Sequence, residues 1–129
     1  MNNKKTTYNG MPDLQEFLTG LGFSLHRSFT GAGDISPNQC NWYACRRVEQ
    51  ESPLCACNEK PVQIVIMPYS FNLYDGNHSE SVEVELRAMT SHGEWWSMRC
   101  YGISAETLKT SLGSIEKRLV AAWKAVNVQ

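Results

Sequence analysis

Four cysteines in one short stretch are the residues of this chain best suited to chemistry: Cys40, Cys45, Cys55 and Cys57. Thiolates bind zinc, form disulfides or act as nucleophiles. The spacing, with four residues between the first pair and one between the second, matches no common zinc signature, and His26 or His78 would have to replace a missing ligand. We expect reduced thiols, with a zinc site or a disulfide as the alternatives.

A second set of residues combines aromatic rings with guanidinium groups on two predicted strands. Its members are Trp42, Tyr43, Arg46, Arg47, Trp95, Arg99 and Tyr101. In the last strand, alternation places the last three of these on one side. Trp96, Met98 and Cys100 fall on the other side, which suits the core.

Such a set on an open sheet face stacks single-stranded bases or forms the hot spot of a protein interface. The structural alternative is that the rings cover the second sheet face or pack beneath the loop predicted at 24–39. We expect contact with a protein partner in preference to nucleic acid, because no lysine cluster accompanies these residues.

An acidic row, Glu80, Glu83 and Glu85, is the third candidate for chemistry. Carboxylates serve in acid–base catalysis, but a solvated strand face opposed by Arg or Lys explains the row more simply. The sequence has no phosphate-binding glycine loop, no histidine–glutamate zinc motif and no nucleophile elbow. We therefore predict a protein that is not an enzyme and that needs no cofactor.

The elements that position these residues follow from hydrophobic periodicity. Apolar residues at helical spacing after Pro12 predict a helix over 12–20, and the glycine-rich segment 24–39 predicts a long loop. Alternation predicts four strands, at 41–48, 62–74, 81–89 and 94–103. Pro68 indicates an edge position or a bulge. A final helix begins after Ser104, its N-cap, and Gly113 predicts a kink or two abutting helices.

The predicted fold is α+β: an antiparallel four-stranded β-meander sheet with N- and C-terminal helices packed on one face, in the order α-β-β-β-β-α. One domain is expected over 1–129, with residues 1–10 flexible. Val120 and Trp123 lie beside the main apolar stripe of the last helix. Homodimer contact through this helix is therefore an alternative to a wide core face.

Composition limits the partners and the location. The 129 residues carry a net charge of −1, which disfavours binding to nucleic acid through bulk electrostatics. No segment approaches the ~20 apolar residues needed to span a bilayer, and no apolar region of a secretory signal follows the first lysines. We expect a cytoplasmic protein without membrane contact.

Two stretches give the chain a resemblance to a class of proteins. The segment Cys-Asn-Trp-Tyr-Ala-Cys-Arg-Arg at 40–47, and the region from Trp95-Trp96 through Leu119-Val-Ala-Ala-Trp123, resemble small uncharacterised accessory proteins of bacteriophages and prophages. The resemblance implies a protein of the bacterial host cytosol that binds a host protein or complex. Some such proteins inhibit defence systems, as anti-CRISPR or anti-restriction proteins. It supplies no catalytic residues.

Overall fold

The computed structural model describes residues 8–27, 42–48, 62–72, 78–89 and 95–127. They form two helices and five strands in the order α-β-β-β-β-β-α. The elements are α1 (Pro12–Gly20), β1 (Ser24–Arg27), β2 (Trp42–Arg47), β3 (Gln63–Asn72), β4 (His78–Met89), β5 (Trp95–Ser104) and α2 (Ala105–Asn127). The predicted α+β class is confirmed, whereas the predicted number of strands is one too few.

Helix α1 begins where the sequence predicts. Pro12 occupies its first turn, where a missing N–H costs no hydrogen bond, and Leu14 and Leu18 face the core. The fully buried Gln15 amide donates 2.9 Å hydrogen bonds to the carbonyls of Tyr8 and Gly10. The side chain of Gln15 thus fixes the chain that enters the helix.

The sheet is a meander of five antiparallel strands in the spatial order β1-β2-β3-β4-β5. The extra strand, β1, lies inside the segment predicted as a loop and pairs with β2 from Ser24↔Cys45 to Arg27↔Trp42. Four residues without apolar alternation become a strand here because they lie against the edge of β2. The rest of the predicted loop, 28–39, lies outside the described residues.

Pro68 is accommodated in β3 without a bulge in that strand. Residues Gln63 to Ile66 of β3 pair with β2, and Pro68 lies beyond them. Among the described residues, Pro68 pairs only with Val82 of β4. The missing N–H therefore falls at a local edge, as proline requires. The irregularity in the sheet lies between β4 and β5 instead, at Val82/Val84.

Helix α2 follows β5 without a loop. The Ser104 hydroxyl accepts a 3.1 Å hydrogen bond from the N–H of Thr107, which confirms it as the N-cap. The helix runs unbroken from Ala105 to Asn127, so the prediction of two abutting helices at Gly113 is wrong. A Cβ at this glycine would meet no heavy atom within 4 Å outside the backbone of its own helix.

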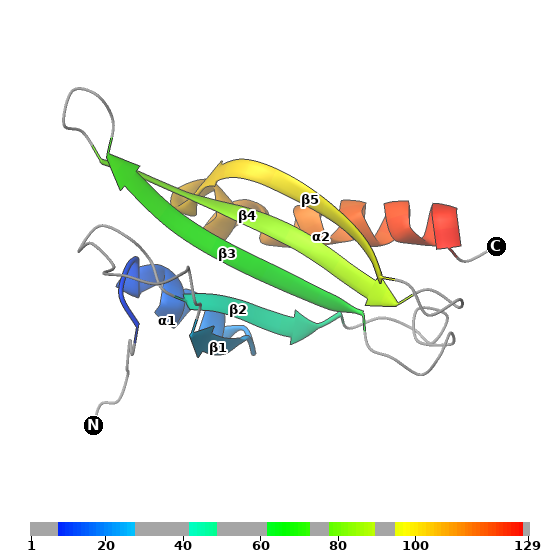
Figure 1. Ribbon diagram of the computed structural model, residues 1–129, viewed down its shortest axis with the longest axis horizontal. Helices are drawn as coiled ribbons and strands as arrows, with labels where there is room; N and C mark the ends of the chain where they lie inside the picture. The colour runs from blue at the N-terminus through cyan, green and yellow to red at the C-terminus, as the bar shows by residue number, and fades with distance from the viewer. Residues whose placement is uncertain (1–7, 28–41, 49–61, 73–77, 90–94, 128–129) are drawn as a thin grey trace.

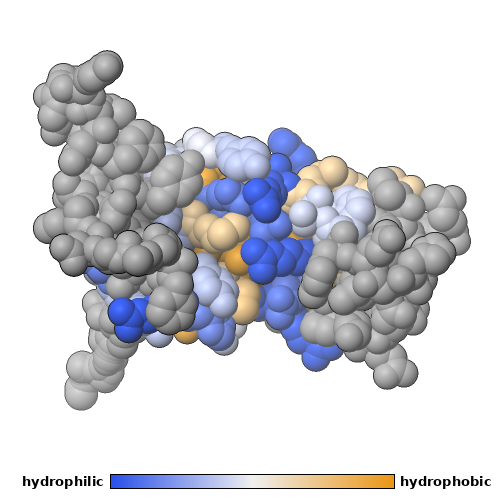
Figure 2. All heavy atoms as spheres, in the orientation of Figure 1, coloured by the Kyte–Doolittle hydropathy of each residue, from blue (hydrophilic) through white to orange (hydrophobic). Residues whose placement is uncertain are grey.

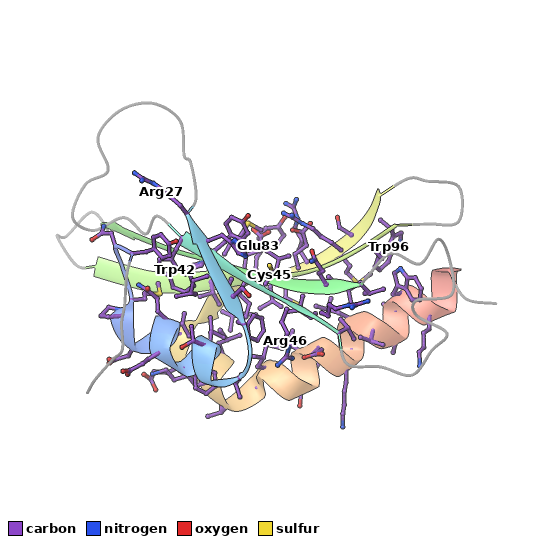
Figure 3. The ribbon with its side chains drawn as sticks, turned by 90° about the horizontal axis from the view of Figure 1, so that it is seen from below. Arg27, Trp42, Cys45, Arg46, Glu83 and Trp96 are labelled. Atoms are coloured by element: carbon purple, nitrogen blue, oxygen red, sulfur yellow. The ribbon has the colours of Figure 1, made fainter. Side chains whose placement is uncertain are left out.

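Both helices lie on the same side of the sheet (Figures 1 and 3). α1 contacts β1, and α2 contacts β4 and β5. The core between the layers includes Leu14, Leu18, Trp42, Ala44, Ile64, Ile66, Val84, Leu86, Leu108 and Trp123. Among the described residues, no helix combines the length and apolar character needed to cross a membrane.

Candidate interaction surface

The face of the sheet opposite α1 and α2, here called the helix-free face, carries most of the sequence-predicted contact residues. Its residues include Tyr43, Cys45 and Arg47 of β2, Val65 of β3, Glu83, Glu85 and Arg87 of β4, and Arg99 and Tyr101 of β5. One row crosses the sheet as Cys45↔Val65↔Glu85↔Arg99. In Figure 2, which views this face, hydrophilic residues gather in its described middle part.

Two predicted contact residues, Trp42 and Arg46, lie on the opposite side, so their predicted place on the contact surface is wrong. Trp42 is 1% exposed and donates a 2.8 Å hydrogen bond from Nε1 to the carbonyl of Gly10. Both residues share the parity of the fully buried Ala44, so strand alternation directs them toward the helices. Neither is available on the helix-free face.

Arg46 has its own partners beneath the sheet. Its Nη2 lies 2.6 Å from Oε1 of Glu116 in α2, Nη1 donates to the carbonyl of Leu21, and the guanidinium lies over the ring of Phe23 at 4.5 Å. Figure 3 shows Arg46 on the helix side of the sheet and Glu83 on the other side. A residue predicted to meet a partner therefore joins the sheet to both helical regions.

Of the other five predicted contact residues, four have described side chains and one, Trp95, does not. Tyr43 is half-buried and stacks on His26 of β1, with ring centroids 5.1 Å apart, while Arg47 is exposed. Trp95 pairs with Met89 at the start of β5, and its side chain lies outside the described part of the molecule. Tyr101 is the most exposed large hydrophobic residue described, at 64%.

A network of charges holds Arg99 and Tyr101 in place. Glu85, only 2% exposed, accepts hydrogen bonds from Nε of Arg87 at 2.9 Å and from Nε of Arg99 at 3.2 Å. Arg99 Nη1 in turn donates to the Tyr101 hydroxyl at 3.3 Å. The Tyr101 hydroxyl, followed by Glu85 and Glu83, raises the pKa of Arg99 above its ordinary value. These contacts place the guanidinium between the two carboxylates and the Tyr101 hydroxyl.

This network borders a shallow pocket of about 360 Å³ lined by Glu85, Arg87, Trp96, Ser97 and Arg99. Glu83 contributes a carboxylate beside it, with Oε2 3.4 Å from Arg99 Nε but without a hydrogen bond among the described residues. The pocket wall therefore combines both signs of charge. Such a wall suits a polar protein surface better than an apolar ligand.

The acidic row named from the sequence includes Glu85, but the burial of its carboxylate was not predicted. The acidic row was expected to be solvated and opposed by Arg or Lys. The opposing arginine is present, because Glu85 pairs directly with Arg99 across β4 and β5, but the carboxylate is enclosed. Only the Glu-x-Glu-x-Arg spacing of β4 opposite an arginine of β5 offered a signal for this network.

The cysteines are only partly described. Cys45 and Cys100 are free thiols, while Cys40, Cys55 and Cys57 lie outside the described residues. Burial raises the pKa of the Cys45 thiol, and the nearby positive charge of Arg87 opposes that shift. Within the described ranges, no three His, Cys, Asp or Glu side chains are grouped to hold a metal ion. The zinc alternative, which needs the three other thiols, stays untested.

Comparison with known proteins adds no relative to this picture: no family model, curated protein or solved structure matches the chain.

Proposed function

We propose that this protein acts by stoichiometric binding to a protein partner through its helix-free face, without catalysis of its own. One observation carries the proposal: the exposed Tyr101 is tied to Arg99, which is anchored by the buried Glu85. Tyrosine and arginine dominate the energetics of protein interfaces. Side chains already held in place lose less conformational entropy when a partner binds.

The charge balance of the face favours a protein over nucleic acid. Arg87 and Arg99 are both paired with carboxylates, and Glu83 and Glu85 lie in the middle of the face. Binding to a phosphate backbone draws its affinity from cations that release counterions, and carboxylates beside them oppose it. A partner surface that carries both charge signs matches this arrangement.

The partner we propose is a host protein or complex in the bacterial cytosol, of the defence-system kind that the resemblance to phage proteins implies. A second copy of the chain is the competing partner, and it would appear as a dimer in solution. A single-stranded nucleic acid is the other competitor, and it would bind with a steep dependence on salt concentration.

The test compares the wild-type chain with a double variant, Arg99→Ala and Tyr101→Ala. The wild type is used to capture proteins from a lysate of the native host, and each captured protein is purified and titrated with both chains. We expect the double variant to bind it about tenfold more weakly or worse, with a shallow salt dependence. The control, Ser114→Ala with Lys117→Ala on the exposed side of α2, is expected to bind as the wild type does. Equal binding by the wild type and the double variant would remove the helix-free face from the proposal.

A further inference from the structure

A groove between the two helices is separate from the helix-free face. It has a volume of about 420 Å³ and is lined by residues of α1, α2 and the β2 arginine: Phe17, Leu21, Arg46, Lys109, Thr110, Leu112, Gly113 and Glu116. Its size falls within the range of small-molecule sites. A smaller hollow of about 180 Å³ shares Lys109 and continues along the boundary between α1 and α2.

Part of the groove wall is apolar. Leu112 is buried, Phe17 is partly buried against the core, and Leu21 is 42% exposed. Gly113 contributes no side chain, and a Cβ built there would meet no heavy atom within 4 Å. Glycine is unfavourable inside a helix. Its presence here leaves open a space that the side chain of any other residue would narrow.

The charged lining residues leave an excess positive charge. Arg46 and Glu116 neutralise each other as an ion pair at 2.6 Å. Lys109 forms an ion pair with Glu106 at 4.0 Å, but that carboxylate is 87% exposed, where water screens the attraction, and it does not line the groove. Asp13 shares the smaller hollow with Lys109. Within the lining of the groove, Lys109 is therefore the cation available to an anion.

We propose that this groove binds a small monocarboxylate with an aliphatic tail. The tail packs against Phe17, Leu21 and Leu112, and the carboxylate lies near Lys109. This arrangement places apolar surface and a single negative charge where the groove supplies their complements. The site is independent of the proposed partner surface, so either can fail without the other.

The test is an NMR titration of the ¹⁵N-labelled full chain with sodium octanoate, with 1-octanol and sodium acetate as separate arms. Octanoate is expected to give saturable shifts at the amides of α1 and of residues 109–116, with an affinity about tenfold higher than that of either comparison compound. Octanol binding as tightly as octanoate would contradict the carboxylate preference. An absence of saturable shifts, or shifts confined to other elements, would contradict the site.

Two pairs of variants sharpen the result. Gly113→Leu fills the groove and is expected to abolish octanoate binding. Ser114→Leu adds the same side chain at the next, exposed position outside the groove and is expected to leave binding unchanged. Lys109→Gln is expected to weaken octanoate about two- to fivefold without changing octanol, whereas Lys117→Gln changes neither. Octanoate binding to Gly113→Leu at wild-type affinity would overturn the proposal, and amide spectra of each variant establish that it is folded.

Discussion

At the scale of single residues, Glu85 connects the sheet to the proposed contact side chains. It is a carboxylate on the helix-free face, yet it is almost fully enclosed and accepts hydrogen bonds from two arginines. A buried charge is tolerated only when partners compensate it, and here the partners extend to the exposed Tyr101. The same residue therefore stabilises the sheet and orients the proposed contact side chains.

Replacing Glu85 with glutamine keeps the shape of the side chain and removes its negative charge. We expect Glu85→Gln to lower the free energy of unfolding by about 1 to 2 kcal/mol, because both arginine partners are more than one-third exposed and water compensates part of the loss. Urea denaturation measures the change. Glu106→Gln, at a carboxylate that is mostly in water, is the control and is expected to stay within about 0.5 kcal/mol of the wild type. Equal stability of both variants would show that Glu85 is not an anchor.

Cys45 gives a chemical readout of the same face. Because burial raises its thiol pKa, the reactive thiolate is scarce at neutral pH, and alkylation is expected to be slower than for a free cysteine and to rise with pH. Arg87→Gln removes the charge that opposes this shift, so the pKa rises further and alkylation slows. Peptide mapping by mass spectrometry after timed iodoacetamide treatment measures the Cys45 rate, with Arg118→Gln on α2 as the control. Faster alkylation in Arg87→Gln would contradict the assigned environment.

At the scale of elements, α2 contains a glycine, Gly113, in its interior. Gly113 does not end the helix, and the space at this position is open. Gly113→Ala is therefore expected to raise the free energy of unfolding by about 0.5 to 1 kcal/mol. Gly22→Ala is the contrast: its φ of +92° disfavours any side chain, and we expect a loss of about 1 kcal/mol or more. Urea denaturation of both variants checks the signs, and a loss at Gly113 would indicate a packing contact.

The elements also show which parts of the fold were predictable. Alternation and helical periodicity predicted α1 and four strands, because each pattern is local. β1 was missed since its four residues become a strand only beside β2. The two sides of β2 were not distinguished, because bulky residues occur on both, and Ala44 gave no local sign of its burial. Glu116 lies 70 residues from Arg46, so no local pattern could reveal that the arginine faces the helices.

At the scale of the whole molecule, both helices cover one side of the sheet (Figure 3). Four of the predicted contact residues lie on the other side: Tyr43, Arg47, Arg99 and Tyr101. Trp42 and Arg46 face the helices instead. The buried Glu85 lies beside Arg99 on the helix-free face. Because the two sides of the molecule differ in this way, the side on which a partner binds can be tested. A partner that binds the helix-free face must approach Tyr101 and stay distant from the exposed side of α2.

Site-specific photo-crosslinking tests that claim most directly. Benzoylphenylalanine replaces Tyr101 on the helix-free face in one sample and Ser114 on α2 in another, and both are irradiated in lysate of the native host. We expect a covalent adduct with the partner protein from position 101 and none from position 114. An adduct formed only from position 114 would contradict the assignment of the partner surface to the helix-free face.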